Sequence, residues 1–478
     1  MSFRSIWANK IIHIVGIGGI GMSALAFILK ELGYRVQGSD VHQSANTKKL
    51  CNHGIEIFIG HNSLNIVNAD LIARSTAVTD SNPEIVHALE LGKPIISRAE
   101  LLAFLMRFKQ SISVAGCHGK TTTTAFISSI LINADLKPTV VNGGIMLDLK
   151  CNAKHGDGNW FVAEADESDG TFTKLPTSIA VVTNIDHDHL DFYGCFDNLK
   201  DSFRQFLAGI DPLGYAVVCF DDVETRNLTI KTLTLDQYVS YGINYNNVDV
   251  CAQNIHFTNG HFVFDVILSE SFASKVGFNK IDSCKIMANG MHNVLNALAA
   301  IGVACIVGLD VESIKNGLSC FVGVDRRFTT LGSIDGIRFV SDYAHHPTEI
   351  AASIAAAKSF TEHSRVLSIV QPHRYSRVSK LFDSFTNVLS TLSDPIVLLD
   401  VCANGELLIS GGSTEDLYNY LKSNNCNSVY YVSNNDLLAF LKETIQTGDL
   451  VLFMGAGDID KIADRIFKDC SMIDSGIF

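Results

Sequence analysis

Short runs of apolar residues recur along the chain, and segments of helical length separate many of them. The runs are IIHIVGI, ISVAG, WFVAEAD, IAVVTNI, VLSIVQ, PIVLLDV and LVLFMGAG. Continuous apolar runs of this length are typical of strands that are buried on both faces of a sheet. Their alternation with helices predicts an α/β protein with mainly parallel sheets, whose ligand sites lie at the carboxyl ends of strands.

The length and the pattern together predict several domains. A chain of 478 residues suggests about three domains. Predicted strands that are followed by glycines begin near residues 11 and 111, which predicts two separate nucleotide-type domains. A third such strand begins near residue 449, late in the last domain. We place the domains at residues 1–108, 109–322 and 323–478. Between about 210 and 285 the pattern becomes polar and strand-like, which predicts an antiparallel appendage on the central domain.

Charge and cysteine usage narrow the class of protein. The net charge of −13 excludes a general electrostatic attraction to nucleic acid or to anionic lipid. Twelve cysteines without a C-x-x-C pair indicate reduced thiols in a cytoplasmic protein. Residues 11–29 are uncharged and nearly long enough to span a membrane, but glycines interrupt them. We therefore expect a buried strand, a glycine turn and an amphipathic helix there, and no membrane span. For the whole protein we expect a monomer or a weak homodimer.

The most informative stretch is residues 114–124, VAGCHGKTTTT, where a strand-like run breaks into glycines, a lysine and four hydroxyls. Backbone N–H groups of such a loop point at phosphate oxygens, a lysine adds positive charge, and a hydroxyl can reach Mg²⁺. The strict phosphate-loop pattern would need glycine at Val114, so the chain uses a tighter form. The residues predicted to bind the triphosphate of a nucleotide are Gly116, Cys117, His118, Gly119, Lys120, Thr121 and Thr122.

A second glycine cluster follows the first strand and fits the pattern G-x-G-x-x-G, with an acidic residue about twenty positions later. Alone it would suggest a nicotinamide dinucleotide. The physical inference is weaker, because a helix N-terminus with bare backbone can approach any diphosphate, including that of a nucleotide sugar. A purely structural glycine turn is the alternative. The candidate residues are Gly16, Gly18, Gly19, Gly21 and Asp40.

Downstream of the phosphate loop, acidic segments end two successive strands, at residues 164–169 and 186–191. Carboxylate oxygens beside a triphosphate are what Mg²⁺ requires, and a neutral imidazole can complete a second cation site. Three later clusters, at residues 325–328, 342–347 and 373–377, combine arginine, histidine and tyrosine. The arginine fork favours carboxylates and phosphates. A zinc site built from these histidines lacks a definite ligand spacing.

Taken in order, these motifs resemble the Mur ligases of bacterial cell-wall synthesis, and most closely the member that adds L-alanine to UDP-N-acetylmuramate. The resemblance covers nearly the whole chain through GIGGIGMSALA, GCHGKTTTT, EADESD, TNIDHDHLDFYG, HNVLNALAA, GVDRRF, DYAHHPTE, QPHRYSR and GAGDI. Cys117, Ser341 and Ala344 depart from the usual family pattern, and none of them removes a charged functional group.

The resemblance implies a Rossmann-like domain for the UDP moiety, a central P-loop-type ATPase and a C-terminal dinucleotide-type domain. It implies that Lys120 and Thr121 hold the β- and γ-phosphates with Mg²⁺ or Mn²⁺, and that Glu164 and His189 bind the metal ions. By the same resemblance, the adenine contacts are His292 and Asn293, and the further ATP contacts are Arg327 and Asp342. The region of L-alanine and the lactyl carboxylate is lined by Tyr343, His345, His373 and Arg377. The expected catalytic residues are Lys120, Arg377 and, as a weak candidate for the base, His345.

Three other functions remain open from the sequence. A tripeptide-recycling Mur ligase would act on the same sugar nucleotide. A nicotinamide-dependent oxidoreductase would use Gly16 to Gly21 and Asp40 but leave Lys120 and the arginine clusters without a role. A regulatory phosphate-loop ATPase would hydrolyse ATP without a small-molecule acceptor.

Overall fold

A computed structural model describes residues 10–472, except 246, 259, 362–364 and 393. The described chain contains three β-sheets, of five, ten and six strands. It divides into two compact units. The first holds residues up to His256 with Val263–Ile286 and Leu295–Val322, and the second holds Phe257–Phe262, Met287–Val294 and the chain from Gly323.

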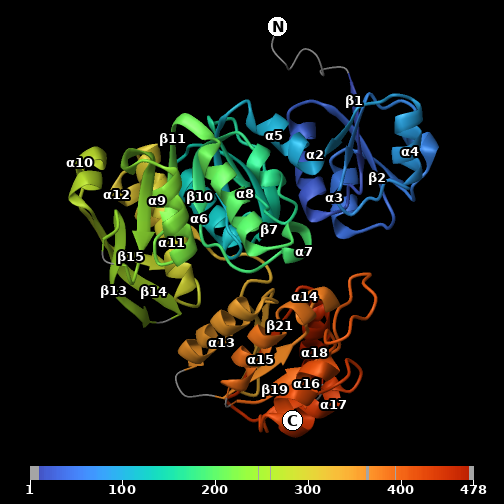
Figure 1. Ribbon diagram of the computed structural model, residues 1–478, viewed down its shortest axis with the longest axis vertical. Helices are drawn as coiled ribbons and strands as arrows, with labels where there is room; N and C mark the ends of the chain where they lie inside the picture. Colours follow the sequence, from blue (N-terminus) through green and yellow to red (C-terminus); the bar gives the residue numbers. More distant parts are fainter. Residues whose placement is uncertain (1–9, 246, 259, 362–364, 393, 473–478) are drawn as a thin grey trace. The chain divides into compact units, whose positions relative to one another are not determined.

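The first sheet has the strand order β3-β2-β1-β4-β5, with every pair parallel. Figure 1 shows α2 and α3 on one side of this sheet and α4 on the other. The order reverses between β1 and β4, which is where an open α/β sheet binds ligands. Its elements are β1 (Ile11–Val15), α2 (Ile20–Glu31), β2 (Arg35–Asp40), α3 (Ala45–Asn52), β3 (Glu56–Ile59), η1 (Ser63–Ile66), β4 (Leu71–Arg74), α4 (Pro83–Glu90), β5 (Ile95–Ser97) and α5 (Arg98–Met106).

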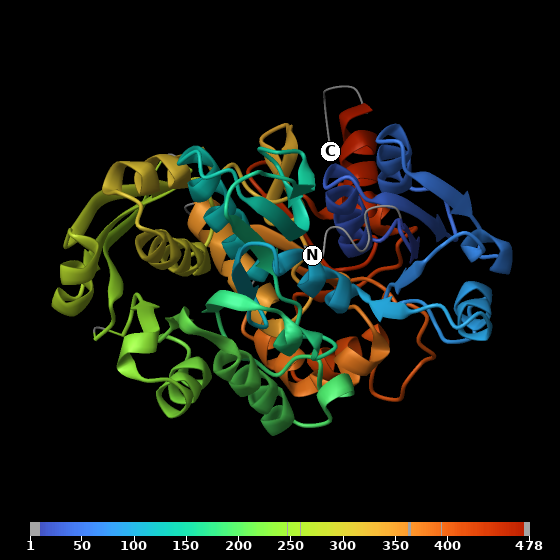
Figure 2. The same cartoon turned by 90° about the horizontal axis from the view of Figure 1, so that it is seen from above.

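The second sheet has the order β15-β14-β13-β12-β11-β10-β6-β9-β7-β8. Figures 1 and 2 show it running from teal to yellow-green strands. Its strands are β6 (Gln110–Ala115), β7 (Thr139–Met146), β8 (Cys151–Lys154), β9 (Trp160–Glu164), β10 (Thr177–Val182), β11 (Ile210–Cys219), β12 (Tyr238–Gly242), β13 (Val250–Thr258), β14 (His261–Leu268) and β15 (Lys280–Ile286). The helices beside it in sequence are α6 (Lys120–Asn133), η2 (Thr171–Lys174), α7 (Leu190–Tyr193), α8 (Phe196–Ala208), α9 (Val223–Thr232), η3 (Leu235–Gln237), α10 (Glu270–Val276), α11 (His292–Val307) and α12 (Val311–Cys320).

The antiparallel appendage predicted for residues 210–285 is wrong in its first half. β11 pairs in parallel with β10, β12 pairs in parallel with β11, and β13 continues in parallel from β12. The segment is therefore an extension of the central sheet. Polar residues in these strands mark the face of the sheet that is exposed to solvent. In β14, for example, buried and half-buried residues alternate. Such exposure does not fix strand direction.

The third sheet has the order β16-β17-β21-β18-β19-β20, in which β16 is antiparallel to β17 and the other pairs are parallel. Its elements are β16 (Thr329–Ile334), β17 (Ile337–Asp342), α13 (Pro347–Thr361), β18 (Val366–Val370), α14 (Tyr375–Lys380), α15 (Phe382–Ser390), β19 (Ile396–Leu398), α16 (Thr414–Ser423), β20 (Val429–Tyr431), α17 (Leu437–Thr444), β21 (Leu450–Met454) and α18 (Ile459–Met472).

The predicted fold class is confirmed, since all seven apolar runs named above form strands of mainly parallel sheets. Residues 11–29 are the predicted strand, turn and helix. Among the described residues, no helix is long and apolar enough to cross a membrane. All twelve cysteines are free thiols.

Candidate active site

The predicted phosphate loop joins the carboxyl end of β6 to the start of α6. Gly116 has φ 133° and Gly119 has φ 82°, a region that favours glycine. A Cβ on Gly116 would lie 2.0 Å from Thr183 Oγ1 and 3.1 Å from the Asn184 backbone, so a side chain cannot be added there without moving the segment that follows β10. α6 begins at Lys120 with no side-chain cap and no acidic residue in its first turn. The unsatisfied N–H groups of this turn are suited to an anion.

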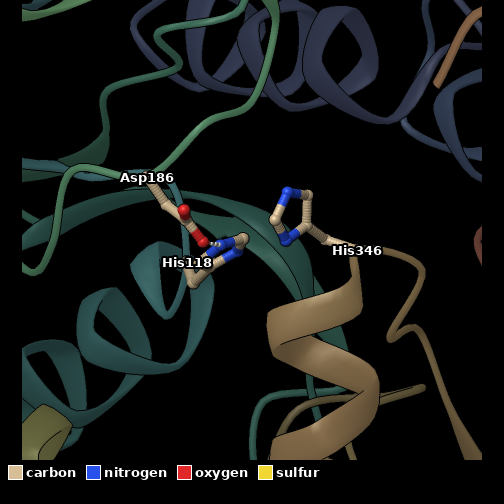
Figure 3. A group of neighbouring side chains, drawn as sticks. All are labelled: His118, Asp186 and His346. Carbon is tan, nitrogen blue, oxygen red and sulfur yellow. Dashed lines mark hydrogen bonds and ion pairs between the residues drawn. The ribbon is translucent and has the colours of Figure 1, made fainter. Parts of the chain in front are cut away.

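The loop is fastened to the segment that follows β10. The His118 carbonyl accepts hydrogen bonds from Thr183 Oγ1 at 2.6 Å and from Asn184 Nδ2 at 2.9 Å. The imidazole of His118 lies beside the carboxylate of Asp186 (Figure 3), with Nε2 at 2.9 Å from Oδ2. The Cys117 sulfur lies 3.2 Å from the Asp186 backbone nitrogen, so a thiol serves as an anchor here. Any movement of the loop therefore involves residues 183–186.

Lys120 lies inside the loop rather than in solvent. Its Nζ donates to the Gly116 carbonyl at 2.7 Å and to the Cys117 carbonyl at 3.2 Å. It also forms an ion pair with the fully buried Glu167, at 2.8 Å. Burial disfavours the charged amine, but Glu167 and Glu164 outweigh it and raise the pKa of Lys120 above its ordinary value. Lys120 is therefore a fixed positive charge at neutral pH.

Glu164 ends β9 beside the first turn of α6. Its Oε2 accepts the Gly143 backbone N–H at 2.8 Å. A Cβ on Gly143 would approach that carboxylate to 2.4 Å, so glycine is required for this contact. Burial raises the pKa of Glu164 above its ordinary value, while Lys120 and a hydrogen bond with Thr121 oppose the shift. An additional cation would stabilise the ionised carboxylate.

His189 and Glu167 complete the group. His189 Nε2 lies 3.3 Å from Glu167 Oε1 and 3.5 Å from Asp188 Oδ2. Burial tends to lower the pKa of His189, but its hydrogen bond to Glu167 and the charge of Asp188 raise it above its ordinary value. The Glu167 position is held by Tyr193, whose hydroxyl donates to the Glu167 carbonyl at 2.5 Å. Glu167 belongs to the motif EADESD, which predicts no separate role for it, although Glu167 joins Lys120 to His189.

The donor set fits a magnesium ion. Thr121, Glu164, Glu167 and His189 offer a hydroxyl, two carboxylates and an imidazole around the start of α6. Hard oxygen donors are the ligands that Mg²⁺ prefers, and a triphosphate would supply more of them. The predicted metal residues Glu164 and His189 are brought to one edge of the sheet through Lys120 and Glu167.

The first glycine cluster forms the turn between β1 and α2. Gly16 has φ 77°, and its N–H donates to the Ser39 carbonyl at 2.9 Å. Asp40 accepts the Gly18 N–H at 2.7 Å, so this predicted residue shapes the turn itself. Gly19 caps α2 without a side-chain bond, and no acidic residue lies in the first helical turn. The N–H groups at the start of α2 thus lie at the carboxyl end of β1, where the strand order reverses.

In the second unit, Tyr343 is surrounded by cations. The guanidinium carbons of Arg326 and Arg327 lie 4.8 and 5.2 Å from the centre of its ring. Glu349 faces the same cluster, with Oε1 at 3.8 Å from Arg327 Nη1 and Oε2 at 3.2 Å from His345 Nδ1. It also accepts the His345 backbone N–H at 3.1 Å. Sequence reasoning missed Glu349, because its role depends on its position in the first turn of α13.

Two further predicted residues lie beside this cluster. The His373 ring is 6.0 Å from the His345 ring, and its Nδ1 lies 3.3 Å from Arg377 Nη1. Burial, together with Arg377, lowers the pKa of His373 to about 4, so its imidazole is neutral at pH 7. The structure thus brings Tyr343, His345, His373 and Arg377 together in the second unit.

The residues predicted to contact adenine, and Asp342 among the further ATP contacts, belong to the second unit, where Asn293 and Asp342 are buried and His292 is exposed. Desolvation by the surrounding residues, together with the charge of Arg327, lowers the pKa of His292 to about 4. Asn293 donates to the Asn289 carbonyl at 2.6 Å. Burial raises the pKa of Asp342, whose Oδ2 accepts the Ser353 hydroxyl at 2.5 Å. His346, also drawn in Figure 3, lies in this unit just before α13, where its backbone N–H donates to Glu349 at 3.3 Å.

Family models match three successive parts of the chain. They are described as "Mur ligase family, catalytic domain" for residues 11–110, "Mur ligase middle domain" for residues 114–304, and "Mur ligase, glutamate ligase domain" for residues 326–457.

Individual relatives extend over nearly the whole length. The UDP-N-acetylmuramate–L-alanine ligase of Rhodospirillum rubrum is 45% identical over 97% of this chain and 95% of its own. The enzyme of the same name from Mesorhizobium japonicum is 43% identical over 96% and 97%. The crystal structure of UDP-N-acetylmuramate-alanine ligase from Thermotoga maritima has a TM-score of 0.79 and 30% identity, over 97% of this chain and 99% of that one. A murein peptide ligase from Psychrobacter arcticus, with a TM-score of 0.70 and 24% identity over 98% and 100%, shares the fold.

Proposed function

The chain belongs to the Mur ligase family, and we propose that it joins L-alanine to the lactyl carboxylate of UDP-N-acetylmuramate at the expense of ATP. Its similarity to L-alanine ligases over nearly full length supports this member of the family. The product is a precursor of peptidoglycan.

The reaction needs ATP because a carboxylate is a poor electrophile. The lactyl carboxylate attacks the γ-phosphorus of ATP and displaces ADP, which gives an acyl phosphate. The free amine of L-alanine then attacks the acyl carbon. The tetrahedral intermediate collapses to the amide and releases inorganic phosphate, and the ammonium proton leaves with a base.

The first unit supplies the charge that phosphoryl transfer requires. We assign the β- and γ-phosphates to the loop Gly116 to Thr122, where the N–H groups at the start of α6 bind oxygens and Lys120 provides positive charge. Magnesium, held by Thr121, Glu164 and His189, would neutralise further charge on the triphosphate. The ion pair between Lys120 and Glu167 aims the ammonium at the loop before ATP arrives.

We assign the sugar nucleotide to residues 1–108, with its diphosphate at the turn Gly16 to Gly21. ATP is assigned to residues 109–322, because the loop at Gly116, unlike the turn at Gly16, carries a lysine beside carboxylates and hydroxyls. Residues 323–478 are assigned to the amino acid and to further ATP contacts. There the Arg377 fork matches the α-carboxylate of L-alanine, and the neutral His373 beside it adds no second charge.

The observation that supports this function is the presence in the first unit of two separate glycine turns that each precede a helix, only one of which has a lysine paired with a buried carboxylate. A nicotinamide oxidoreductase would not need the turn at Gly116 with its lysine. A regulatory ATPase would not need the turn at Gly16.

The proposed function is tested by measuring the transfer of an oxygen label from the lactyl carboxylate to inorganic phosphate. UDP-N-acetylmuramate labelled with ¹⁸O in the lactyl carboxylate is incubated with ATP, Mg²⁺ and L-alanine, and the phosphate and sugar nucleotide are analysed by mass spectrometry. The acyl-phosphate route transfers one ¹⁸O to inorganic phosphate for each amide formed. Amide formation with unlabelled phosphate would exclude carboxylate phosphorylation, and a lack of amide would exclude the ligase assignment.

A further inference from the structure

The side chain of Arg98 lies beside the first turn of α2, the helix to which the proposed function assigns the diphosphate. Arg98 is the first residue of α5, and a capping box between Ser97 and Glu100 fixes the start of that helix. A Cβ on Gly21 would lie 3.2 Å from Arg98 Cδ and 3.5 Å from Nη1. The guanidinium group therefore lies against the first turn of α2.

The same guanidinium group reaches the acidic segment of the central domain. Arg98 Nη2 donates to Asp166 Oδ2 at 3.0 Å, across 68 positions of sequence. Asp166 Oδ1 accepts the Ser168 backbone N–H at 3.0 Å, which holds the carboxylate in place. The side chains of Arg98 and Asp166 are 21% and 38% exposed, so an incoming anion can reach them.

Asp166 in turn acts on the site assigned to ATP. It follows Glu164 by two residues and precedes Glu167 directly. Glu167, the residue next to Asp166, forms the ion pair with Lys120 at 2.8 Å. Asp166 thus lies between Arg98 and the acidic residues beside Lys120.

We propose that Arg98 binds the diphosphate of the sugar nucleotide and, by releasing Asp166 as it does so, links occupancy of that site to binding of metal and ATP. The inference rests on the proposed function. An arginine drawn toward the diphosphate leaves Asp166 with less positive charge beside it. The acidic segment then attracts a magnesium–nucleotide complex more strongly. Thermodynamic linkage requires the reverse effect to be equal.

The expected size follows from the exposure of the ion pair. A partly exposed pair contributes little, so the coupling should be about two- to fivefold in affinity. Asp166→Asn removes the competitor for Arg98 and should tighten UDP-N-acetylmuramate binding by a similar factor when nucleotide and metal are absent. Arg98→Gln removes a charge-assisted contact to the diphosphate and should weaken that binding by about tenfold or more.

The experiment is calorimetric titration of the full chain with UDP-N-acetylmuramate, with and without saturating Mg²⁺ and the non-hydrolysable analogue AMP-PNP. The proteins are the parent, Arg98→Gln, Asp166→Asn and the double variant. Lys30→Gln, at the far end of α2, is the control for loss of one positive charge, and it should behave as the parent does. Binding of Mg²⁺–AMP-PNP by each variant verifies folding, and Arg98→Lys replaces Arg98→Gln if the latter fails that check.

The proposal expects the effects of Asp166→Asn on sugar-nucleotide binding and on coupling to disappear when Arg98 is also replaced. An unchanged affinity in Asp166→Asn, or an equal effect with and without Arg98, would overturn it. If the parent binds Mg²⁺–AMP-PNP but no UDP-N-acetylmuramate, the proposed function itself fails.

Discussion

Replacement of Glu84 by glutamine should destabilise the N-terminal domain by an amount that depends on pH. The Glu84 side chain is fully buried at the start of α4, beside the equally buried His13 of β1. Its carboxylate accepts hydrogen bonds from Ser39 Oγ at 2.5 Å and from Asn65 Nδ2 at 2.6 Å. Burial alone would raise the pKa, but hydrogen bonds from His13, Ser39 and Asn65 outweigh it and lower the pKa of Glu84 from 4.5 to about 2.

The magnitude follows from this shift. A change from 4.5 to about 2 corresponds to about 3 kcal/mol of stability. Because the folded-state pKa is the lower one, this contribution is fully present above pH 4.5 and is lost as the pH falls toward 2. Glu84→Gln carries no charge at any pH. It should therefore be less stable than the parent by about 3 kcal/mol at pH 7, and the difference should shrink to less than half at pH 3.

Hydrogen exchange followed by mass spectrometry measures the effect in the intact chain. Peptides from β1 and β2 should exchange roughly 100-fold faster at pH 7 in Glu84→Gln than in the parent. Calorimetric unfolding at pH 7 and pH 3 measures the pH dependence. Glu90→Gln, on the exposed side of the same helix, should change stability by less than about 0.5 kcal/mol. Equal exchange in parent and Glu84→Gln, or a difference that does not vary with pH, would refute an ionised Glu84 in the folded domain.

Four further outcomes are expected. Lys120→Ala should lower kcat by at least about 100-fold in a steady-state assay while the circular dichroism spectrum is unchanged, and near-normal turnover would remove Lys120 from the mechanism. Glu164→Ala and His189→Ala should each raise the Mg²⁺ concentration needed for half-maximal rate, and two unchanged magnesium titrations would exclude them as ligands. Gly18→Val should weaken binding of UDP-N-acetylmuramate and spare ATP in calorimetry; the opposite result would mean that the two glycine turns are assigned the wrong way round. Arg377→Ala should raise KM for L-alanine by roughly 10- to 150-fold with little change for ATP, and L-alanine amide should be a poor substrate of the parent; efficient use of the amide would contradict a carboxylate contact.

Much of the fold could be predicted because buried parallel strands are apolar along their whole length. The interruption of residues 11–29 by glycines was enough to predict β1, its turn and α2. Strand direction could not be predicted in the same way. β11 and β12 carry polar positions and were expected to be antiparallel, but they continue the parallel part of the sheet, because exposure and direction are separate properties.

The candidate site could be predicted where several residues form a local motif, as at Gly116 to Thr121. Single charged residues that act across long separations could not be found this way. Glu167 meets Lys120 across 47 positions, and Arg98 meets Asp166 across 68.

The buried contact between His13 and Glu84 could not be predicted from the sequence, for a different reason. His13 lies within an apolar run that indicates only a buried strand, and Glu84 follows a proline at a helix start. Neither position carries a sequence signal for a buried hydrogen-bonded pair, since such pairs depend on which elements pack together.

The most direct test of the ligase assignment is the rate of phosphate release from ATP with UDP-N-acetylmuramate and a panel of acceptors. The panel contains L-alanine, other amino acids and the tripeptide L-alanyl-γ-D-glutamyl-meso-diaminopimelate. We expect rapid release only when the sugar nucleotide and L-alanine are both present, with one UDP-N-acetylmuramoyl-L-alanine formed per phosphate. Release that does not depend on the acceptor, or that depends on the tripeptide and not on L-alanine, would contradict the account.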